Sequence, residues 1–128
     1  MKLCWCVSVV LLAGLLTLQS GCCPAIDCAY PVMFQVQNSS NQKAVSDVTT
    51  TGVDGVTCQI NGSQTYCSSN TGETKDLTLT VAAKGFKPAT FTLKHQKPTG
   101  ICGGCFYYKI YDSDGKEITD KLVTLQPE

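Results

Sequence analysis

The chain has 128 residues and carries ten lysines against ten acidic residues, so its formal net charge is zero at neutral pH. It contains no arginine, the side chain that binds phosphate and guanine through a planar fork of donors. Without an excess of positive charge, the composition argues against nucleic-acid binding and phosphoryl chemistry.

The first segment in chain order is an apolar run over residues 7–18, which follows the positively charged Lys2. Such a run is typical of the hydrophobic core of a secretory signal. A transmembrane helix needs about 20 apolar residues, and the polar Gln19 and Ser20 end this run too early. We therefore predict a signal peptide over residues 1–21, which leaves 107 residues (128 minus 21) for one small mature domain.

The junction Ser20-Gly21-Cys22 resembles the lipobox of bacterial lipoproteins, in which the cysteine sulfur receives a diacylglyceryl group before the chain is cut in front of it. Gln19 departs from that pattern, because the family prefers an aliphatic residue three places before the cysteine. The resemblance implies that Cys22 is the lipid attachment site, bearing palmitate-type acyl chains. Residues 22–30, which end before Pro31, are predicted to form a Cys-rich tether. The alternative is an ordinary signal-peptidase cut that releases a freely secreted protein.

The mature chain shows the alternation of apolar and polar residues that is typical of strands. Residues 32–38 (VMFQVQN) alternate so that Val32, Phe34 and Val36 share one side, and residues 44–52 (AVSDVTTTG) are rich in valine and threonine. Further strands are predicted over residues 77–82, 89–93, 106–111 and 121–125.

Turn signals separate these strands, and helical periodicity is absent outside the signal. Asn61-Gly62 predicts the tip of a hairpin, and Lys84-Gly85 predicts the turn of an antiparallel pair. About seven short antiparallel strands predict an all-β domain over residues 31–128. The expected architecture is an immunoglobulin-like or prealbumin-like β-sandwich stapled by disulfides.

Two segments resemble the carboxypeptidase regulatory-like, prealbumin-type sandwich domains. Residues 81–93 (VAAKGFKPATFTL) are similar to the strand, Gly-Phe turn and returning strand of that family. Residues 43–52 (KAVSDVTTTG) are similar to its early small-apolar pair and Val-Thr strand. The resemblance implies a non-catalytic accessory or adhesive role at a cell surface.

Nine cysteines are present, of which Cys4 and Cys6 lie in the signal and Cys22 is the predicted lipid site. The others are disulfide candidates, since small exported domains use covalent bridges to compensate for a limited core: Cys23, Cys28, Cys58, Cys67, Cys102 and Cys105. A bridge from Cys58 to Cys67 closes the predicted hairpin. We expect the tether cysteines to pair with the last two, but the sequence alone does not choose among the pairings.

The motif Cys102-Gly-Gly-Cys105 has an alternative interpretation as the redox pair of a thiol-disulfide oxidoreductase. That chemistry favours a cysteine at a helix N-terminus, where the thiolate is stabilised, whereas this motif precedes a predicted strand. A zinc site needs a second close pair, and eight residues separate Cys58 from Cys67. We therefore favour structural disulfides, and we expect no metal and no cofactor.

Three other features are assigned structural roles. His95, the only histidine, is expected to be solvated at a strand end rather than catalytic. Residues 112–120 (DSDGKEITD) begin like a calcium loop but lack its third spaced carboxylate and its last glutamate, so we expect a hairpin turn. An alternating strand directs half of its aromatic residues to the core, which weakens the case for a sugar-stacking face on Phe106, Tyr107, Tyr108 and Tyr111.

Together these features predict a lipid-anchored protein of the bacterial cell envelope, at the outer membrane or cell surface. Its sandwich is expected to be a non-catalytic binding or structural module. The expected partners are the membrane, through the anchor, and an envelope protein or a glycan, with no nucleic acid. Two alternatives remain: a thiol-disulfide oxidoreductase that uses Cys102 and Cys105, and a freely secreted Cys-rich protein.

Overall fold

The computed structural model describes residues 31–97 and 105–128, and every regular element in them is a strand. The strands are β1 (Val32–Asn38), β2 (Thr49–Thr51), β3 (Thr57–Asn61), β4 (Gln64–Ser69), β5 (Leu77–Ala82), β6 (Ala89–Gln96), β7 (Tyr107–Tyr111) and β8 (Leu122–Leu125). The predicted all-β class is confirmed, with eight strands in place of about seven.

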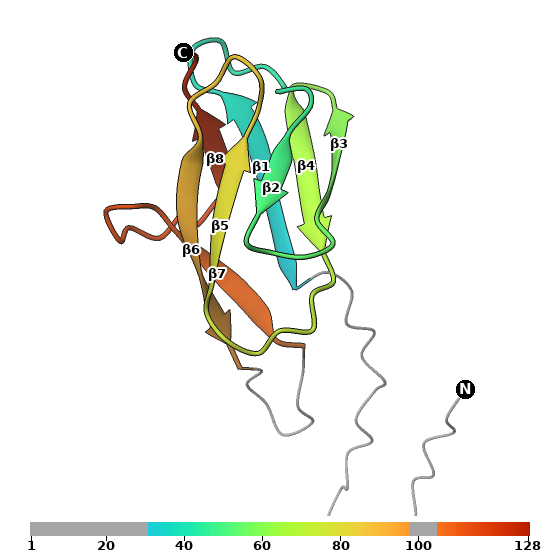
Figure 1. Ribbon diagram of the computed structural model, residues 1–128, viewed down its shortest axis with the longest axis vertical. Coiled ribbons are helices and arrows are strands. Elements are labelled where there is room, and N and C mark those ends of the chain that lie inside the picture. The colour runs from blue at the N-terminus through green and yellow to red at the C-terminus, as the bar shows by residue number, and fades with distance from the viewer. Residues whose placement is uncertain (1–30, 98–104) are drawn as a thin grey trace, which may run out of the picture.

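The strands form two four-stranded sheets, in the orders β3-β4-β1-β8 and β2-β5-β6-β7, which lie as two layers (Figure 1). Neighbouring strands are antiparallel except β1 and β8, which are parallel. The predicted purely antiparallel arrangement is therefore wrong at this pair. A parallel neighbour needs a crossover connection, and here the whole domain separates the two strands, so no local pattern indicates their pairing.

β1 has the predicted alternation, with Val32, Phe34 and Val36 buried and Met33 exposed. The inward residues of β5, β6 and β7 in the second sheet pack against this buried side of β1. The shared core consists of Val32, Phe34, Val36, Val45, Val53, Cys67, Leu79, Val81, Phe91, Leu93, Tyr108, Ile110, Val123 and Leu125. Burial of this apolar surface between the sheets is the main stabilising term of the fold.

The β3–β4 hairpin is present, and its turn lies one residue later than Asn61-Gly62 suggests. Asn61 is paired with Gln64, so Gly62 and Ser63 form a two-residue turn. Gly62 has a φ of 63°, and the turns favoured in two-residue hairpins require a positive φ at this first central position. Glycine adopts this conformation without the steric penalty of a β-carbon.

The predicted strand over residues 44–52 is shorter than expected, because only Thr49–Thr51 form β2. Upstream, the hydroxyl of Thr65 accepts a hydrogen bond from the Val45 amide (3.1 Å) and donates one to the Val45 carbonyl (2.5 Å). Asp47 has a φ of 53°, which interrupts the extended backbone. The Thr65 side chain on β4 therefore forms the hydrogen bonds with the Val45 main chain that a neighbouring strand would otherwise form.

Gly52 ends β2 at a close approach between the chain and β5. Its φ is 92°, and a β-carbon there would overlap the carbonyl oxygen of Thr78. This position requires glycine for two independent reasons, its backbone conformation and the space it occupies.

Candidate functional site

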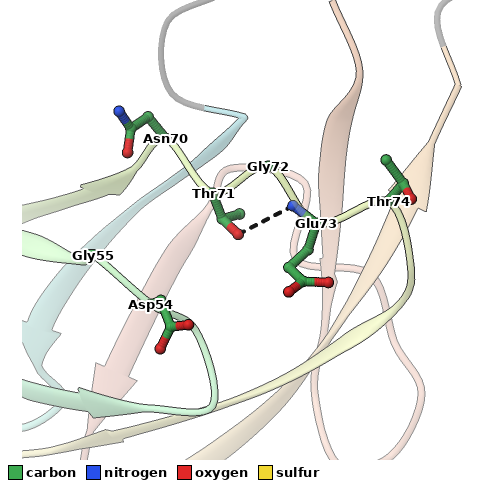
Figure 2. Close-up of a pocket in the computed structure, with 7 residues that line it drawn as sticks. All are labelled: Asp54, Gly55, Asn70, Thr71, Gly72, Glu73 and Thr74. Carbon is green, nitrogen blue, oxygen red and sulfur yellow. Dashed lines mark hydrogen bonds between the residues drawn. The ribbon is translucent and has the colours of Figure 1, made fainter.

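An open depression on the surface, with a volume of about 470 Å³, is a candidate site (Figure 2). It lies between two loops, one around Asp54 and Gly55 and the other over residues 70–74. In Figure 2 the carboxylates of Asp54 and Glu73 lie between the loops, whereas the amide of Asn70 points away from them.

Hydrogen bonds from β4 and β7 hold these two loops in place. The Ser69 hydroxyl donates to the Asp54 carbonyl at 2.6 Å and accepts from the Thr71 amide at 3.2 Å, which joins one loop to the other. From the opposite sheet, the Tyr108 hydroxyl donates to the carbonyls of Glu73 (2.6 Å) and Lys75 (3.2 Å). The walls of the depression are thus fixed by the fold.

The chemistry of the depression is that of a solvated, weakly acidic surface. Glu73 forms an exposed ion pair with Lys75 at 3.8 Å, and exposed pairs of this kind contribute little to stability. No group of three or more His, Cys, Asp or Glu side chains able to hold a metal ion occurs among the described residues. The depression therefore offers neither a nucleophile with a base nor a built cation site.

Tyr108 is 2% exposed, and its hydroxyl is a titratable group in direct contact with the Glu73 carbonyl at the wall of the depression. Burial raises the pKa of Tyr108 above its ordinary value of 10.0, and the negative charges of Glu73 and Asp76 raise that pKa further. The phenol is therefore held in its neutral, donating form, which suits its role as the donor that fixes the loop over residues 70–76.

The predicted hairpin disulfide is present between Cys58 and Cys67. The two residues are directly opposite in the β3–β4 register, with Cα atoms 4.1 Å apart. Nine positions separate them in sequence, and closing a loop of this length stabilises a fold by about 2.7 kcal/mol in the chain-entropy model.

Cys105 is also disulfide-bonded. The other predicted cysteine sites, Cys22, Cys23, Cys28 and Cys102, lie outside the described residues, as does the predicted tether over residues 22–30.

His95 does not have the solvated position that the sequence suggested. Its ring packs against Phe106 (5.1 Å between centroids) and edge-on against Tyr108 (5.6 Å). Its Nε2 atom is buried without a hydrogen-bond partner among the described residues, while its backbone amide donates to the Asp76 carboxylate at 2.9 Å. The sequence did not predict this packing because Phe106 is eleven positions away, immediately before β7.

The four aromatic residues near β7 do not form one face. Tyr108 points into the core, whereas Tyr107 on the opposite side of the strand is 45% exposed. Tyr111 lies outward under the Lys94 ammonium, 4.5 Å from the ring centre, which is a cation–π contact. A sugar-stacking stripe over all four residues is therefore excluded by the strand's own alternation.

The acidic segment after β7 forms a turn. One carboxylate oxygen of Asp112 accepts hydrogen bonds from the amides of Asp114 (3.0 Å) and Lys116 (2.9 Å). Gly115 donates to the Asp112 carbonyl at 3.1 Å, which closes the hairpin. These bonds engage the carboxylate that would otherwise begin a calcium loop, in agreement with the predicted turn.

A surface that the sequence analysis did not single out lies on the sheet β3-β4-β1-β8. Tyr66 points outward from β4 and is 42% exposed. The strand register places Gln59 of β3 and Gln35 of β1 directly beside it, one on each side. The alternation in residues 64–69 indicates that Tyr66 faces outward, but its neighbours come from strands that only the folded sheet brings together.

Comparison with models of known families, with curated proteins and with solved structures gives no match for this chain. Within the described ranges, no helix has the length and apolar character required to cross a bilayer.

Proposed function

We propose that this chain is an exported protein of the bacterial cell envelope, anchored by acyl chains on Cys22 at the outer membrane or cell surface. Its sandwich acts as a non-catalytic binding or structural module of the carboxypeptidase regulatory-like type. The observation that carries the proposal is the Cys58–Cys67 disulfide in a small all-β domain that follows a signal-like segment. Disulfides persist in oxidising compartments and are rare in the cytosol.

Other features support the same proposal. Cys105 is a third disulfide-bonded cysteine in the described residues, which adds a second bridge to a domain with a limited core. The residue after Cys22 is Cys23, not the Asp that resembles an inner-membrane retention signal, which favours the outer membrane. The expected two-layer, all-β architecture is present, and the connection between β5 and β6 carries the Gly85 and Phe86 on which the proposed family assignment rests.

The topology defines which end of the sandwich an anchor would hold. Pro31 precedes β1, and Val32 pairs with Ser69, so the chain enters at the end where β4 leads into the loop over residues 70–76. The hairpin turn at Gly62 lies at the opposite end (Figure 1). A tether of nine residues, 22–30, spans at most about 30 Å when fully extended, so an anchored sandwich stays close to the bilayer.

Metabolic labelling with an alkyne analogue of palmitate tests the anchor directly. The full-length chain is expressed in a bacterial host, and acylation is read after click chemistry in the wild type, Cys22→Ala and Cys23→Ala. We expect label in the wild type and in Cys23→Ala, and none in Cys22→Ala. An unlabelled wild-type protein in the medium or periplasm refutes the anchor, and label that persists in Cys22→Ala refutes the assigned site.

A further inference from the structure

We propose that the outward face of the sheet β3-β4-β1-β8 binds an uncharged glycan chain, with Tyr66 as the stacking platform and Gln35 and Gln59 as its hydrogen-bonding groups. This inference rests on the proposed binding role of the sandwich and is independent of the lipid anchor. We call this surface the Tyr66 face; its central residues are Met33, Gln35, Gln59, Gln64, Tyr66 and Ser68.

The register of the sheet places the Tyr66 ring between the side-chain amides of two glutamines. Tyr66 is paired with Gln35 on one side and with Gln59 on the other, so the three side chains form a row across the strands. Directly paired residues on one face of a sheet have Cβ atoms about 5 Å apart, which is contact distance for these side chains. The row therefore presents an aromatic ring flanked by an amide on each side.

Hydrogen bonding leaves the flanking amides available to a ligand. The Tyr66 hydroxyl donates to Oε1 of Gln64, two residues earlier on β4, at 3.2 Å, which directs the ring along the strand. In the described part of the chain, the side-chain amides of Gln35 and Gln59 make no hydrogen bond. Each amide offers two donors and one acceptor, which match the hydroxyl and acetamido groups of a sugar.

The charge pattern defines the class of ligand. None of the four strands of this sheet contains a charged residue. The opposite sheet differs, since its outward face carries Lys94 on β6 and Lys109 on β7. An ionic ligand gains nothing on the Tyr66 face, whereas a neutral polyhydroxylated ligand exchanges its hydrogen bonds to water for bonds to amides.

The size of the face argues for a glycan rather than a protein. Four strands at a spacing of about 4.8 Å and five residues at about 3.3 Å give a platform of roughly 14 by 16 Å. Its area of roughly 230 Å² is well below the 800 Å² or so that each partner buries in a standard protein interface. Two exposed large apolar side chains lie on this face, Tyr66 and Met33, whereas the exposed Ile60 of β3 is paired with the inward-facing Thr65 and lies on the other face.

Stacking explains the position of the tyrosine. The face of an aromatic ring is electron-rich, and the C–H groups of a pyranose ring carry the complementary partial charge. A rigid sheet holds the ring and amides in place before binding, so little conformational entropy is lost when the sugar arrives. With a single stacking ring, we expect a dissociation constant of about 0.1 to 1 mM for a short oligosaccharide.

The test is an NMR titration of the mature full chain in detergent micelles with the hexasaccharide of β-1,4-linked N-acetylglucosamine. We expect saturable shifts of the Gln35 and Gln59 side-chain amides, with an affinity that is unchanged when salt is raised, because no charges are involved. Tyr66→Ala should weaken binding at least about tenfold, whereas Tyr66→Phe, which keeps the ring, should stay within about threefold.

Tyr107→Ala is the matched control, because Tyr107 is exposed to nearly the same extent (45% against 42%) on the other sheet. It should leave the affinity unchanged. No saturable binding at millimolar sugar, an equal loss in Tyr107→Ala, or salt-sensitive preference for an anionic polygalacturonate oligosaccharide each overturns the inference. A protein that fails to label with the palmitate analogue yet binds the hexasaccharide refutes the anchor and leaves the Tyr66 face supported.

Discussion

The Tyr108 hydroxyl, a side-chain group of the second sheet, fixes the loop over residues 70–76, and Tyr108→Phe removes it without disturbing the ring. The ring contacts with His95 and Phe106, at 5.6 and 6.2 Å, remain available to phenylalanine. What is lost is the pair of hydrogen bonds to the carbonyls of Glu73 (2.6 Å) and Lys75 (3.2 Å).

The hydroxyl has a single proton, which the two carbonyls share, so Tyr108→Phe should lower the free energy of unfolding by about 1 kcal/mol. For a domain of this size, that loss lowers the melting temperature by roughly 4 to 5 °C. Urea unfolding followed by circular dichroism, with disulfides intact, measures the first quantity, and thermal unfolding measures the second. Tyr107→Phe removes an exposed hydroxyl and should change the free energy by less than about 0.5 kcal/mol.

The pKa of Tyr108 adds a pH dependence with a defined sign. Because the folded state raises this pKa above 10.0, the unfolded chain loses the phenolic proton first as pH rises. The stability that the neutral phenol contributes is therefore complete below pH 10 and decreases as pH rises through the folded-state pKa. Tyr108→Phe should have a shallower decrease in this range than the wild type. Equal stability and equal alkaline slopes in the two proteins contradict this assignment.

Three further substitutions test other parts of the fold by the same urea assay. Gly52→Ala should lower the free energy of unfolding by at least about 2 kcal/mol, because of backbone strain and overlap with the Thr78 carbonyl. Gly85→Ala has open space around it and should lower that free energy by only about 1 kcal/mol. Similar losses in the two variants contradict the close approach at Gly52. His95→Phe should stabilise by about 1 kcal/mol, because it removes a buried nitrogen that has no partner among the described residues, and a clear loss of stability refutes this. Replacing Cys58 and Cys67 together by alanine should cost about 3 kcal/mol, and an unchanged urea midpoint contradicts the chain-entropy estimate.

Local patterns predicted the parts of this fold that depend on neighbours in sequence. The alternation of Val32, Phe34 and Val36 defined the inward side of β1, and the turn signal near Gly62 located the β3–β4 hairpin. The Cys58–Cys67 bridge followed from that hairpin, because an antiparallel register brings residues on its two strands together.

The features that sequence did not predict depend on tertiary contacts. The segment before β2 is extended in pattern, yet the hydroxyl of Thr65 satisfies the main chain of Val45 and removes the need for a ladder. His95 is half-buried, with its Nε2 atom shielded from solvent, because β6 and β7 are adjacent. Tyr66 was not predicted as part of a binding surface, because the amides beside it belong to two other strands and only the strand register brings them next to the ring.

Intact mass spectrometry of the protein extracted from membranes, without reductant, tests the central proposal most directly. We expect a chain that begins at Cys22, carries a diacylglyceryl group, and has the mass deficit of paired cysteines that include Cys58–Cys67 and Cys105. An acyl-free chain that begins elsewhere, or a chain with all of its cysteines reduced, contradicts export with lipid anchoring.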